Sequence, residues 1–386
     1  MSLTPLYLGY DHVTFYVGSV KAMASFLIDK YGFIPYCTMG LETGSRKVSG
    51  FVVKNGNVII QLINTVIPLH TQRTDPLVDV IHTHIAYHGD SVKDVAFKVD
   101  NVEGAYEMAI AGGAKSLMEP KTFIDEFGEI TMARVSGIAD TVHTLVNRSK
   151  YNGFLPGPYR MEEYSFNDEV HKDEPISLNC IDHVVQNDGW NKMEEDCKYY
   201  EKVFGFHQFW SVDDSVIHTD YSALKSTVMA SENEIIKLPI NEPAKGLKTS
   251  QIEEFMEFNG SAGIQHLALR VDDILTTVDH MKKRGVEFII VPEQYYSSLK
   301  KRLENSKHPR FVEPFERIKE LGILVDYDEH GYLLQLFTRP LFDRPSFFLE
   351  IIQRRNHDGF GAGNFKSLFE VLELDQARRG NLRDSN

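Results

Sequence analysis

Apolar and polar residues alternate along several short segments in the second half of the chain. Residues 263–271 show this period of two, which is typical of a β-strand with one buried face. Residues 271–283 instead space their apolar side chains as on one face of a helix, and Gly285 follows where such a helix would end. Apolar and aromatic runs of strand length then cover 332–338 and 347–353. The pattern predicts a β-α-β-β-β unit.

Five short segments of the first half recur in the second half, in the same order and about 172 residues later. The pairs are Asp11-His12-Val13 with Asp182-His183-Val184, Gly32 with Gly205, 95–100 with 267–272, Gly113 with Gly285, and Pro120 with Pro292. A shared order at a nearly constant spacing indicates that the chain contains an internal duplication.

The duplication predicts two homologous domains, residues 1–155 and 156–386. Glycine and proline at 153–158 and an acidic stretch at 168–174 give the join the composition of a linker. The second half carries about 31 additional residues near 294–324, where helical spacing among charged residues predicts surface helices. We therefore expect an α+β fold in which each domain consists of paired β-α-β-β-β modules.

Composition narrows the range of functions. The 386 residues carry a net charge of −14 and no long basic stripe, so nucleic acid is not an expected partner. No segment approaches the roughly 20 apolar residues of a membrane span, and the first residues lack a secretory signal pattern, so we expect a cytoplasmic protein without membrane insertion. Cys37, Cys180 and Cys197 form no CxxC pair and are expected to be reduced thiols, for which a packing role is commoner than catalysis.

Three residues of the second half, His183, His266 and Glu350, form a set of which the first half keeps only one member. Their partners in the repeat are His12, Asp94 and Thr144. A residue that the scaffold requires should occur in both copies, so the second copy alone is expected to hold a site. Glu350 also lies inside an apolar run, where a carboxylate must be paired, protonated or bound to a metal. Two imidazoles and one carboxylate are the ligand set of non-haem Fe(II) oxygenases.

Two other interpretations of these residues remain open. His183 and His266 could be hydrogen-bonded core histidines beside a buried ion pair of Glu350. Alternatively, the three side chains could hold catalytic zinc, although the chain has no HExxH helix to support a zinc site.

Six segments carry a resemblance to a known family. They are 239–243, Gln265-His266, 326–328, 331–335, 350–354 and 359–365. In order and over essentially the whole chain they resemble the signature segments of the 4-hydroxyphenylpyruvate dioxygenase family. The repeated modules likewise resemble the vicinal oxygen chelate superfamily, in which paired modules form a cup around a metal ion.

The resemblance implies an enzyme of tyrosine catabolism that converts 4-hydroxyphenylpyruvate and O2 into homogentisate and CO2, with Fe(II) as cofactor. The 2-oxo acid of the substrate would itself chelate the metal, so no separate 2-oxoglutarate would be needed. A homodimer is also implied. By the family's pattern the metal ligands are His183, His266 and Glu350. The implied substrate-binding residues are Ser226, Pro239 and Asn241, and the implied catalytic residues are Gln251, Gln265, Gln335, Phe337, Phe348, Phe360, Asn364 and Phe365.

Two local features of the site are open to a structural test. Gln265 directly precedes His266, so strict alternation along a strand would aim its side chain away from the metal. After Glu350, a glycine-rich crossing leads to Asn364, a plausible helix N-cap, and then to an apolar helical stripe. The stripe consists of Phe365, Leu368, Phe369 and Leu372. We expect a C-terminal helix that acts as a lid over the site, with simple docking on the sheet as the alternative.

Three other functions compete with the leading one. 4-Hydroxymandelate synthase resembles it in fold, metal and substrate but hydroxylates the side chain. Extradiol ring-cleaving dioxygenases use similar modules and ligands, but the segment 359–365 argues against them. A catalytically inactive binding protein could use the same modules, and the three intact ligands argue against it.

Overall fold

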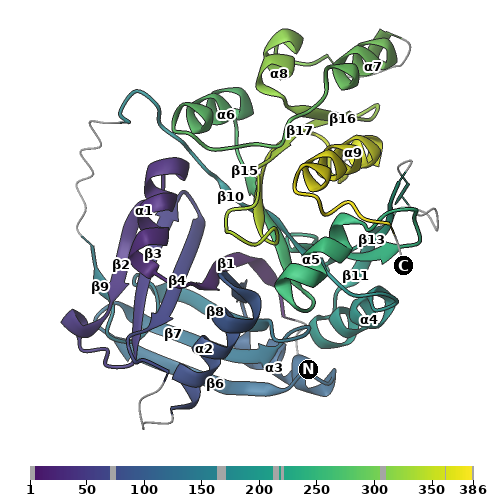
Figure 1. The fold of residues 1–386 in the computed structure, drawn as a ribbon. Helices are drawn as coiled ribbons and strands as arrows, with labels where there is room; N and C mark the ends of the chain where they lie inside the picture. The colour runs from purple at the N-terminus through teal and green to yellow at the C-terminus, as the bar shows by residue number, and fades with distance from the viewer. Residues whose placement is uncertain are drawn as a thin grey trace.

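Each half of the chain folds as one curled, mostly antiparallel sheet flanked by helices (Figure 1). The structure is a computed structural model that describes residues 5–69, 75–162, 171–211, 217–218, 221–304, 310–360 and 362–384. The strands of the first sheet are β1 (Tyr7–Tyr16), β2 (Ile34–Met39), β3 (Val48–Asn55), β4 (Val58–Thr65), β5 (Ser91–Val99), β6 (Ser116–Asp125), β7 (Gly128–Ser136), β8 (Val142–Tyr151) and β9 (Arg160–Met161). Those of the second are β10 (Cys180–Asn187), β11 (His207–Ser211), β12 (Ile217–His218), β13 (Ala223–Ala230), β14 (Lys237–Ala244), β15 (Gly263–Arg270), β16 (Leu324–Tyr327), β17 (Tyr332–Phe337) and β18 (Phe348–Arg355).

The two sheets have the same internal plan. The first runs β6-β7-β8-β5-β1-β4-β3-β2-β9, and the second runs β11-β13-β14-β10-β15-β18-β17-β16 with β12 paired to β13. In each, two antiparallel central strands, β1 and β5 or β10 and β15, are flanked by parallel neighbours. This shared topology is the one expected from the duplication.

The helices complete the modules. They are α1 (Val20–Tyr31), α2 (Pro76–His88), α3 (Val102–Ala111), α4 (Met193–Phe204), α5 (Gln251–Asn259), α6 (Ile274–Lys283), α7 (Glu293–Glu304), α8 (Phe315–Leu321) and α9 (Ala362–Arg378), and a short 3-10 turn covers Leu41–Thr43. Each half therefore consists of two β-α-β-β-β modules joined by a helix. The joining helix is α2 in the first half and α5 in the second. The predicted α+β fold of paired modules is confirmed.

The second module of the second half shows how well the pattern located its elements. The predicted strands at 263–271, 332–338 and 347–353 are β15, β17 and β18. The predicted helix begins later than its apolar pattern, at Ile274, because the Asp273 side chain caps it by accepting a hydrogen bond of 3.0 Å from the Thr276 N–H. The additional residues form α7 and α8 on the outside, as expected.

The join between the halves departs from a simple linker. Its residues 163–170, which include part of the acidic stretch, lie outside the described residues. Just before them, β9 pairs with β2 and so continues the first sheet as far as Met161. The first sheet therefore extends slightly past residue 155.

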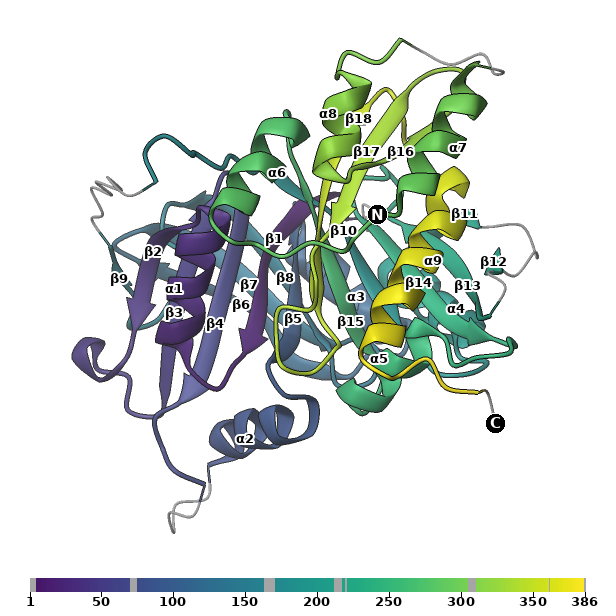
Figure 2. The same cartoon turned by 45° about the horizontal axis from the view of Figure 1, so that its top comes forward.

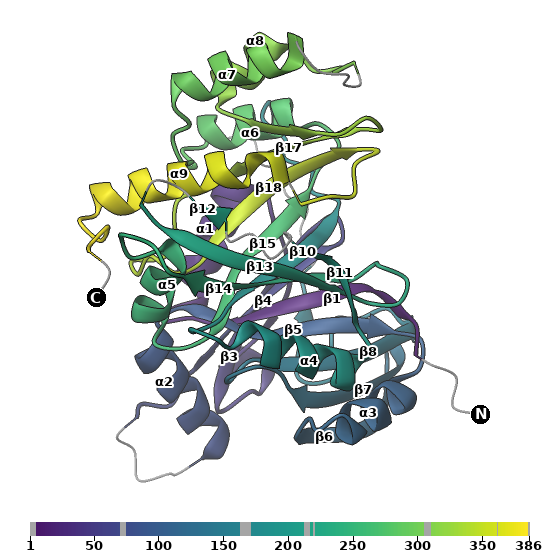
Figure 3. The ribbon, with the colours of Figure 1, turned by 90° about the vertical axis from the view of Figure 1, so that its right-hand side faces the viewer.

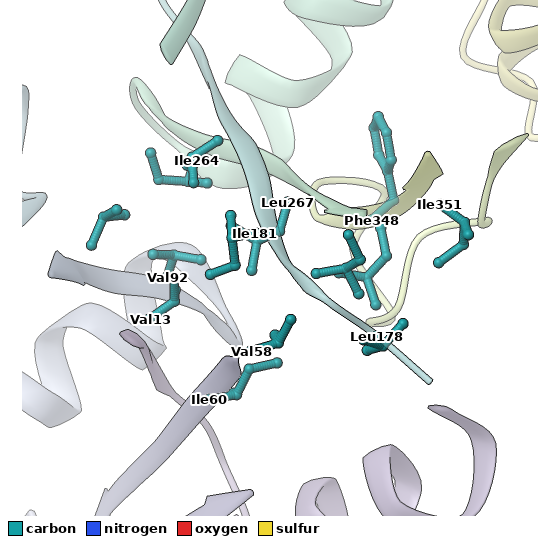
Figure 4. Close-up of a cluster of buried hydrophobic side chains, with 14 of the residues drawn as sticks. Val13, Val58, Ile60, Val92, Leu178, Ile181, Ile264, Leu267, Phe348 and Ile351 are labelled. Carbon is teal, nitrogen blue, oxygen red and sulfur yellow. The ribbon is translucent and has the colours of Figure 1, made fainter. Parts of the chain in front are cut away.

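One continuous apolar core joins the two sheets. Figure 4 shows Val13, Ile60 and Val92 of the first sheet beside Ile264 and Leu267 of the second. An aromatic cluster strengthens the same contact, because the Phe204 ring of α4 lies 5.7 Å from that of Phe97 and 5.0 Å from that of His143. The halves are thus packed as one body.

Helix α9 covers one side of the second sheet. It runs past β16 and β12, and its C-terminal end lies beside α5 (Figures 2 and 3). Because α9 begins at Ala362, Asn364 lies inside the helix, and its prediction as the N-cap is wrong. No helix within the described ranges is long and apolar enough to cross a membrane.

The shared core leads to a prediction about cooperativity. Replacing Phe204 with Ala should cost about 3 to 5 kcal/mol and should separate unfolding into two steps, because the cavity lies between the halves. Phe154→Ala is the matched control, since Phe154 is equally buried but packs within the first sheet. Denaturant unfolding followed by fluorescence and circular dichroism would test this, and a single unchanged transition for Phe204→Ala would contradict it.

Candidate metal centre

Strand register brings His183, His266 and Glu350 together. Strand β15 lies between β10 and β18, and its Ala268 pairs with His183 on one side and Glu350 on the other. His266 precedes Ala268 by two residues and therefore points to the same face of the sheet. Three residues that are far apart in sequence thus meet on one face of three neighbouring strands.

Two β-bulges in the pairing of β10 with β15 change the direction of the side chains just before His183 and His266. Ile181 pairs with Leu269 and His183 with Ala268, so Asp182 is an extra, unpaired residue on β10. In the same way Gln265 is extra on β15. A β-bulge re-aims the side chain that it displaces. Strict alternation therefore does not apply to Gln265, because the bulge turns it into the same pocket as His266, where its prediction as a site residue needs it.

Each bulged residue orients the imidazole that follows it. The Asp182 Oδ1 lies 2.8 Å from His183 Nδ1, and the Gln265 Oε1 lies 3.0 Å from His266 Nδ1. Gln265 in turn donates a hydrogen bond of 2.5 Å to the Gln251 Oε1. With both Nδ1 atoms engaged, both Nε2 atoms are left to face the cluster, which is the arrangement that outer hydrogen bonds impose on metal-binding histidines.

The atoms at the centre fit a metal ion. His183 Nε2 and His266 Nε2 lie 3.1 and 3.3 Å from the same Glu350 oxygen, and all three residues are buried. His266 Nε2 and Glu350 Oε1 have no hydrogen-bond partner in the protein. Buried polar atoms are nearly always satisfied, so these two orphaned atoms point to an ion as their partner.

The charges in the cluster suit the same role. Burial opposes ionisation of Glu350, but His183 and His266 outweigh it and lower the pKa of the carboxyl group to about 2. Burial lowers the pKa of His266, although Glu350 raises it, and this favours the neutral imidazole that a metal requires. Glu350 is therefore a carboxylate, and an ion pair with the histidines would still leave its Oε1 without a partner.

Behind His183 lies an ion pair that both halves contain. Arg354 donates hydrogen bonds of 2.8 and 2.9 Å to the two Asp182 oxygens and a third, of 2.5 Å, to the Gly359 carbonyl. In the first half, Arg148 binds both oxygens of Asp11 and the carbonyls of Gly153 and Phe154. The Asp-His-Arg arrangement is therefore part of the inherited scaffold.

The first-half residues that correspond to His266 and Glu350 are occupied by contacts within the protein. Asp94 accepts hydrogen bonds from the Thr144 backbone N–H at 3.0 Å, from the Thr144 hydroxyl and from Arg134. With a threonine in place of Glu350 and an aspartate that is already satisfied, the two equivalent positions offer His12 no free partner for binding a metal. We find no orphaned ligand atom among these three described residues.

A second group in the first half, His84, His88 and Asp140, also has ligand-like spacing. Its atoms are occupied: His84 contacts Ser91 at 2.8 Å, and His88 contacts the Asn259 carbonyl at 2.6 Å. Lys93 also places its ammonium 3.0 Å from the Asp140 carboxylate. This group is a satisfied polar contact between α2 and α5.

The predicted site residues gather around the metal cluster. One pocket is lined by His183, His266, Glu350, Ser226, Pro239, Asn241, Gln251, Gln265, Gln335, Phe337, Phe348 and Phe360. The side chains of Asn364 and Phe365 lie outside the described part of the structure. The sequence analysis did not assign the pocket residues Val185, Leu224, Val228 and Ile352. Val185 and Ile352 each lie two residues from a ligand on the same strand, so alternation could have identified them.

Helix α9 contributes one wall of this pocket. Its Phe369 and Leu372 belong to the predicted lid stripe and line the pocket, while the side chains of Phe365 and Leu368 are not described. The room left for water-sized spheres is only about 60 Å³, which holds a few water molecules. Pockets for small-molecule ligands usually measure about 300 to 1,000 Å³, so the pocket as it stands is small for a ligand.

The fold and the cluster together define a class. Paired β-α-β-β-β modules around a His-His-Glu cluster form the vicinal oxygen chelate fold. Residues 181–336 match the model of the Glyoxalase/Bleomycin resistance protein/Dioxygenase superfamily.

Curated relatives specify the family. Proteins named 4-hydroxyphenylpyruvate dioxygenase are 53% identical in Yarrowia lipolytica (97% of this chain and 94% of the relative) and 46% identical in Dictyostelium discoideum (97% and 100%). A mutant 4-hydroxymandelate synthase from Streptomyces coelicolor superposes with a TM-score of 0.81 at 27% identity, over 96% of this chain and 99% of the other. The chain belongs to the 4-hydroxyphenylpyruvate dioxygenase family and is an enzyme.

The repeated ion pair supplies a matched test of the outer hydrogen bonds. Asp182→Asn should weaken metal binding by about 10- to 100-fold, because His183 loses the partner that fixes its orientation. Asp11→Asn breaks the same pair in the first half and should show a comparable loss of stability with normal metal binding. Metal titration and thermal unfolding of both variants measure the two effects. Equal metal affinity in both variants would show that Asp182 serves only the scaffold.

Proposed function

We propose that this enzyme converts 4-hydroxyphenylpyruvate and O2 into homogentisate and CO2, with Fe(II) held by His183, His266 and Glu350. The observation that carries the proposal is the buried cluster with two orphaned ligand atoms. It lies in a chain about half identical to relatives named for this activity. Zinc also suits two histidines and a glutamate, but it has no redox chemistry to offer a dioxygenase.

The ligand charges match the proposed substrate. Bound Fe(II) would supply open coordination positions for the 2-oxo acid group of the substrate and for O2. Two neutral imidazoles and the Glu350 carboxylate leave one positive charge on a divalent ion, and a monoanionic 2-oxo acid neutralises it. The substrate is thereby recognised by charge as well as by shape.

Polar side chains on the walls would hold and orient the substrate. The Ser226 hydroxyl is buried and has no partner in the protein, so it is available to a ligand. Asn241 donates to Asn187 at 3.1 Å and keeps its own carbonyl oxygen as an acceptor. The Gln251 carbonyl is used by Gln265, which leaves its NH2 group as a donor. We propose that these groups, with Gln335, position the substrate ring.

Aromatic side chains would keep water from the reaction. Phe348 stacks on His266 with ring centroids 4.7 Å apart, and Phe337 meets the same ring edge-on at 5.9 Å. Phe360 packs against His183 at 5.1 Å. A dry pocket protects a reactive oxidant from side reactions, which supports the assignment of these rings as the substrate walls.

We assign the chemistry to one half of the molecule. Residues 156–386 would form the catalytic domain, and residues 1–155 would form a degenerate copy that retains the scaffold but not the metal site. By family resemblance we also propose a homodimer in the cytoplasm. The degenerate copy would support the catalytic sheet through the shared core.

Helix α9 would act as a lid, since the pocket has too little room for a substrate of 13 non-hydrogen atoms while α9 is in place. Two glycines, Gly359 and Gly361, precede the helix in the sequence and a third, Gly363, is its second residue, which suits a hinge. Entry and release would then require α9 to move away from the pocket.

The direct test is anaerobic reconstitution with Fe(II), followed by 4-hydroxyphenylpyruvate and O2 and chromatography of the product. Homogentisate is expected from the natural chain. Glu350→Ala should lose Fe(II) binding and turnover yet remain folded, and His12→Ala should keep both, because the first half lacks the other ligands. Hydroxymandelate as product, or no product from the iron-loaded chain, would refute the proposal.

The proposal that α9 acts as a lid is tested by the ratio of homogentisate formed to O2 consumed. Phe369→Ala opens the pocket wall and should lower this ratio while Fe(II) content stays normal, since water then reaches the site. Phe206→Ala, a change at a buried ring far from the pocket, should cost about 3 to 5 kcal/mol of stability with an unchanged ratio. If Phe369→Ala behaves like Phe206→Ala, α9 merely docks on the sheet.

A further inference from the structure

A second, larger cleft lies between the two halves of the chain. It measures about 790 Å³ and is lined by equivalent strands of the repeat, β1 and β10, β5 and β15, and β8 and β18. The equivalence extends to single residues, because Lys98 faces the cleft from β5 and its repeat partner Arg270 faces it from β15. The cleft is therefore lined by matching surfaces of the two copies.

The lining carries an excess of positive charge. Two ion pairs lie within it, Asp11 with Arg148 and Asp182 with Arg354. In each pair the two charges neutralise each other. The four other basic residues in the lining are Lys54, Lys98, Lys237 and Arg270. Within the described ranges none of these four forms an ion pair with a carboxylate. The whole chain carries a net charge of −14, so a local group of unneutralised cations is unusual for it.

Only two acidic groups remain in the lining to offset these four cations. One is Glu234, which lies 3.7 Å from His207, and the other is Asp358; both act on Lys237 among the four cations. Burial and the neighbouring Arg354 guanidinium lower the pKa of Lys237, although Asp182, Asp358 and Glu234 act in the opposite direction. An anion in the cleft would relieve this repulsion between like charges.

The same lining offers apolar and aromatic surface. Tyr10, Tyr36, Ile181 and Ile235 contribute to it. The Lys54 ammonium lies 5.3 Å from the Tyr36 ring centroid, so ring and cation are presented together. A ligand that satisfies both features carries an aromatic or heteroaromatic ring and at least two negative charges.

We propose that this interdomain cleft is a second ligand site for compact aromatic polyanions, separate from the metal centre. One layer of side chains divides the two sites: Asp182 faces the cleft, while His183 faces the metal pocket. Arg354 lines the cleft and also holds the Gly359 carbonyl before α9. A ligand in the cleft therefore contacts the residue that anchors the start of the lid.

The test uses two anions of this chemistry, benzene-1,3,5-tricarboxylate and adenosine 5′-monophosphate, titrated calorimetrically into the Fe(II)-loaded full chain under anaerobic conditions. At least one should bind with a dissociation constant below about 1 mM. Binding of the tricarboxylate alone indicates a carboxylate ligand, and binding of the nucleotide alone indicates a phosphate ligand. Failure of both overturns the proposal.

Charge-matched variants locate the binding. The double variant Lys98→Gln/Arg270→Gln should weaken it about tenfold, because two cations leave the lining. Lys115→Gln/Lys121→Gln removes the same charge from exposed positions of the first half and should leave affinity unchanged. Glu350→Ala should bind the anion normally. Equal losses in both double variants, or a loss in Glu350→Ala, would place the anion elsewhere and overturn the proposal.

Discussion

The site depends on how β10 and β15 pair. His183 and Glu350 pair with Ala268 from its two sides, so they flank a single small side chain. His266 lies two residues before Ala268 and joins them on the same face. One unpaired residue on each strand, Asp182 and Gln265, then brings a hydrogen-bond acceptor next to each imidazole. A regular ladder would hold the same three ligands but would turn those acceptors to the opposite face of the sheet. Ligand orientation is thus a property of backbone register.

The duplication separates what the scaffold needs from what the chemistry needs. Both halves keep an aspartate, a histidine and an arginine in the same contact, and both bulge at the aspartate. Only the second half adds His266 and Glu350, and among the described residues buried ligand atoms without partners occur only there. The first half instead satisfies Asp94 with Thr144 and Arg134. Structural and catalytic demands can therefore be assigned to different residues of one motif.

Much of the fold and of the metal cluster was predictable from the sequence, because the alternation of apolar residues and the internal repeat can both be recognised in it. The three cluster residues stood out by comparison of the two copies, and β15, β17 and β18 followed from their apolar patterns. The direction of Gln265 was not predictable, since a bulge arises between strands and leaves no local signal. The cap at Asn364 failed because α9 begins two residues earlier. The interdomain cleft combines residues far apart in sequence, such as Lys54 and Lys237, which only the packing of the halves brings together.

The bulges also determine where the chain can change length during evolution. Deleting the single residue Gln265 would restore regular pairing, but it would also remove the acceptor for His266 and shift one end of β15 by one position. The segment that holds α7 and α8 lies between β15 and β16, where added residues alter no strand register. The roughly 31 residues that distinguish the two copies were inserted there. The largest difference in length between the two copies therefore lies outside the paired strands that carry the metal ligands.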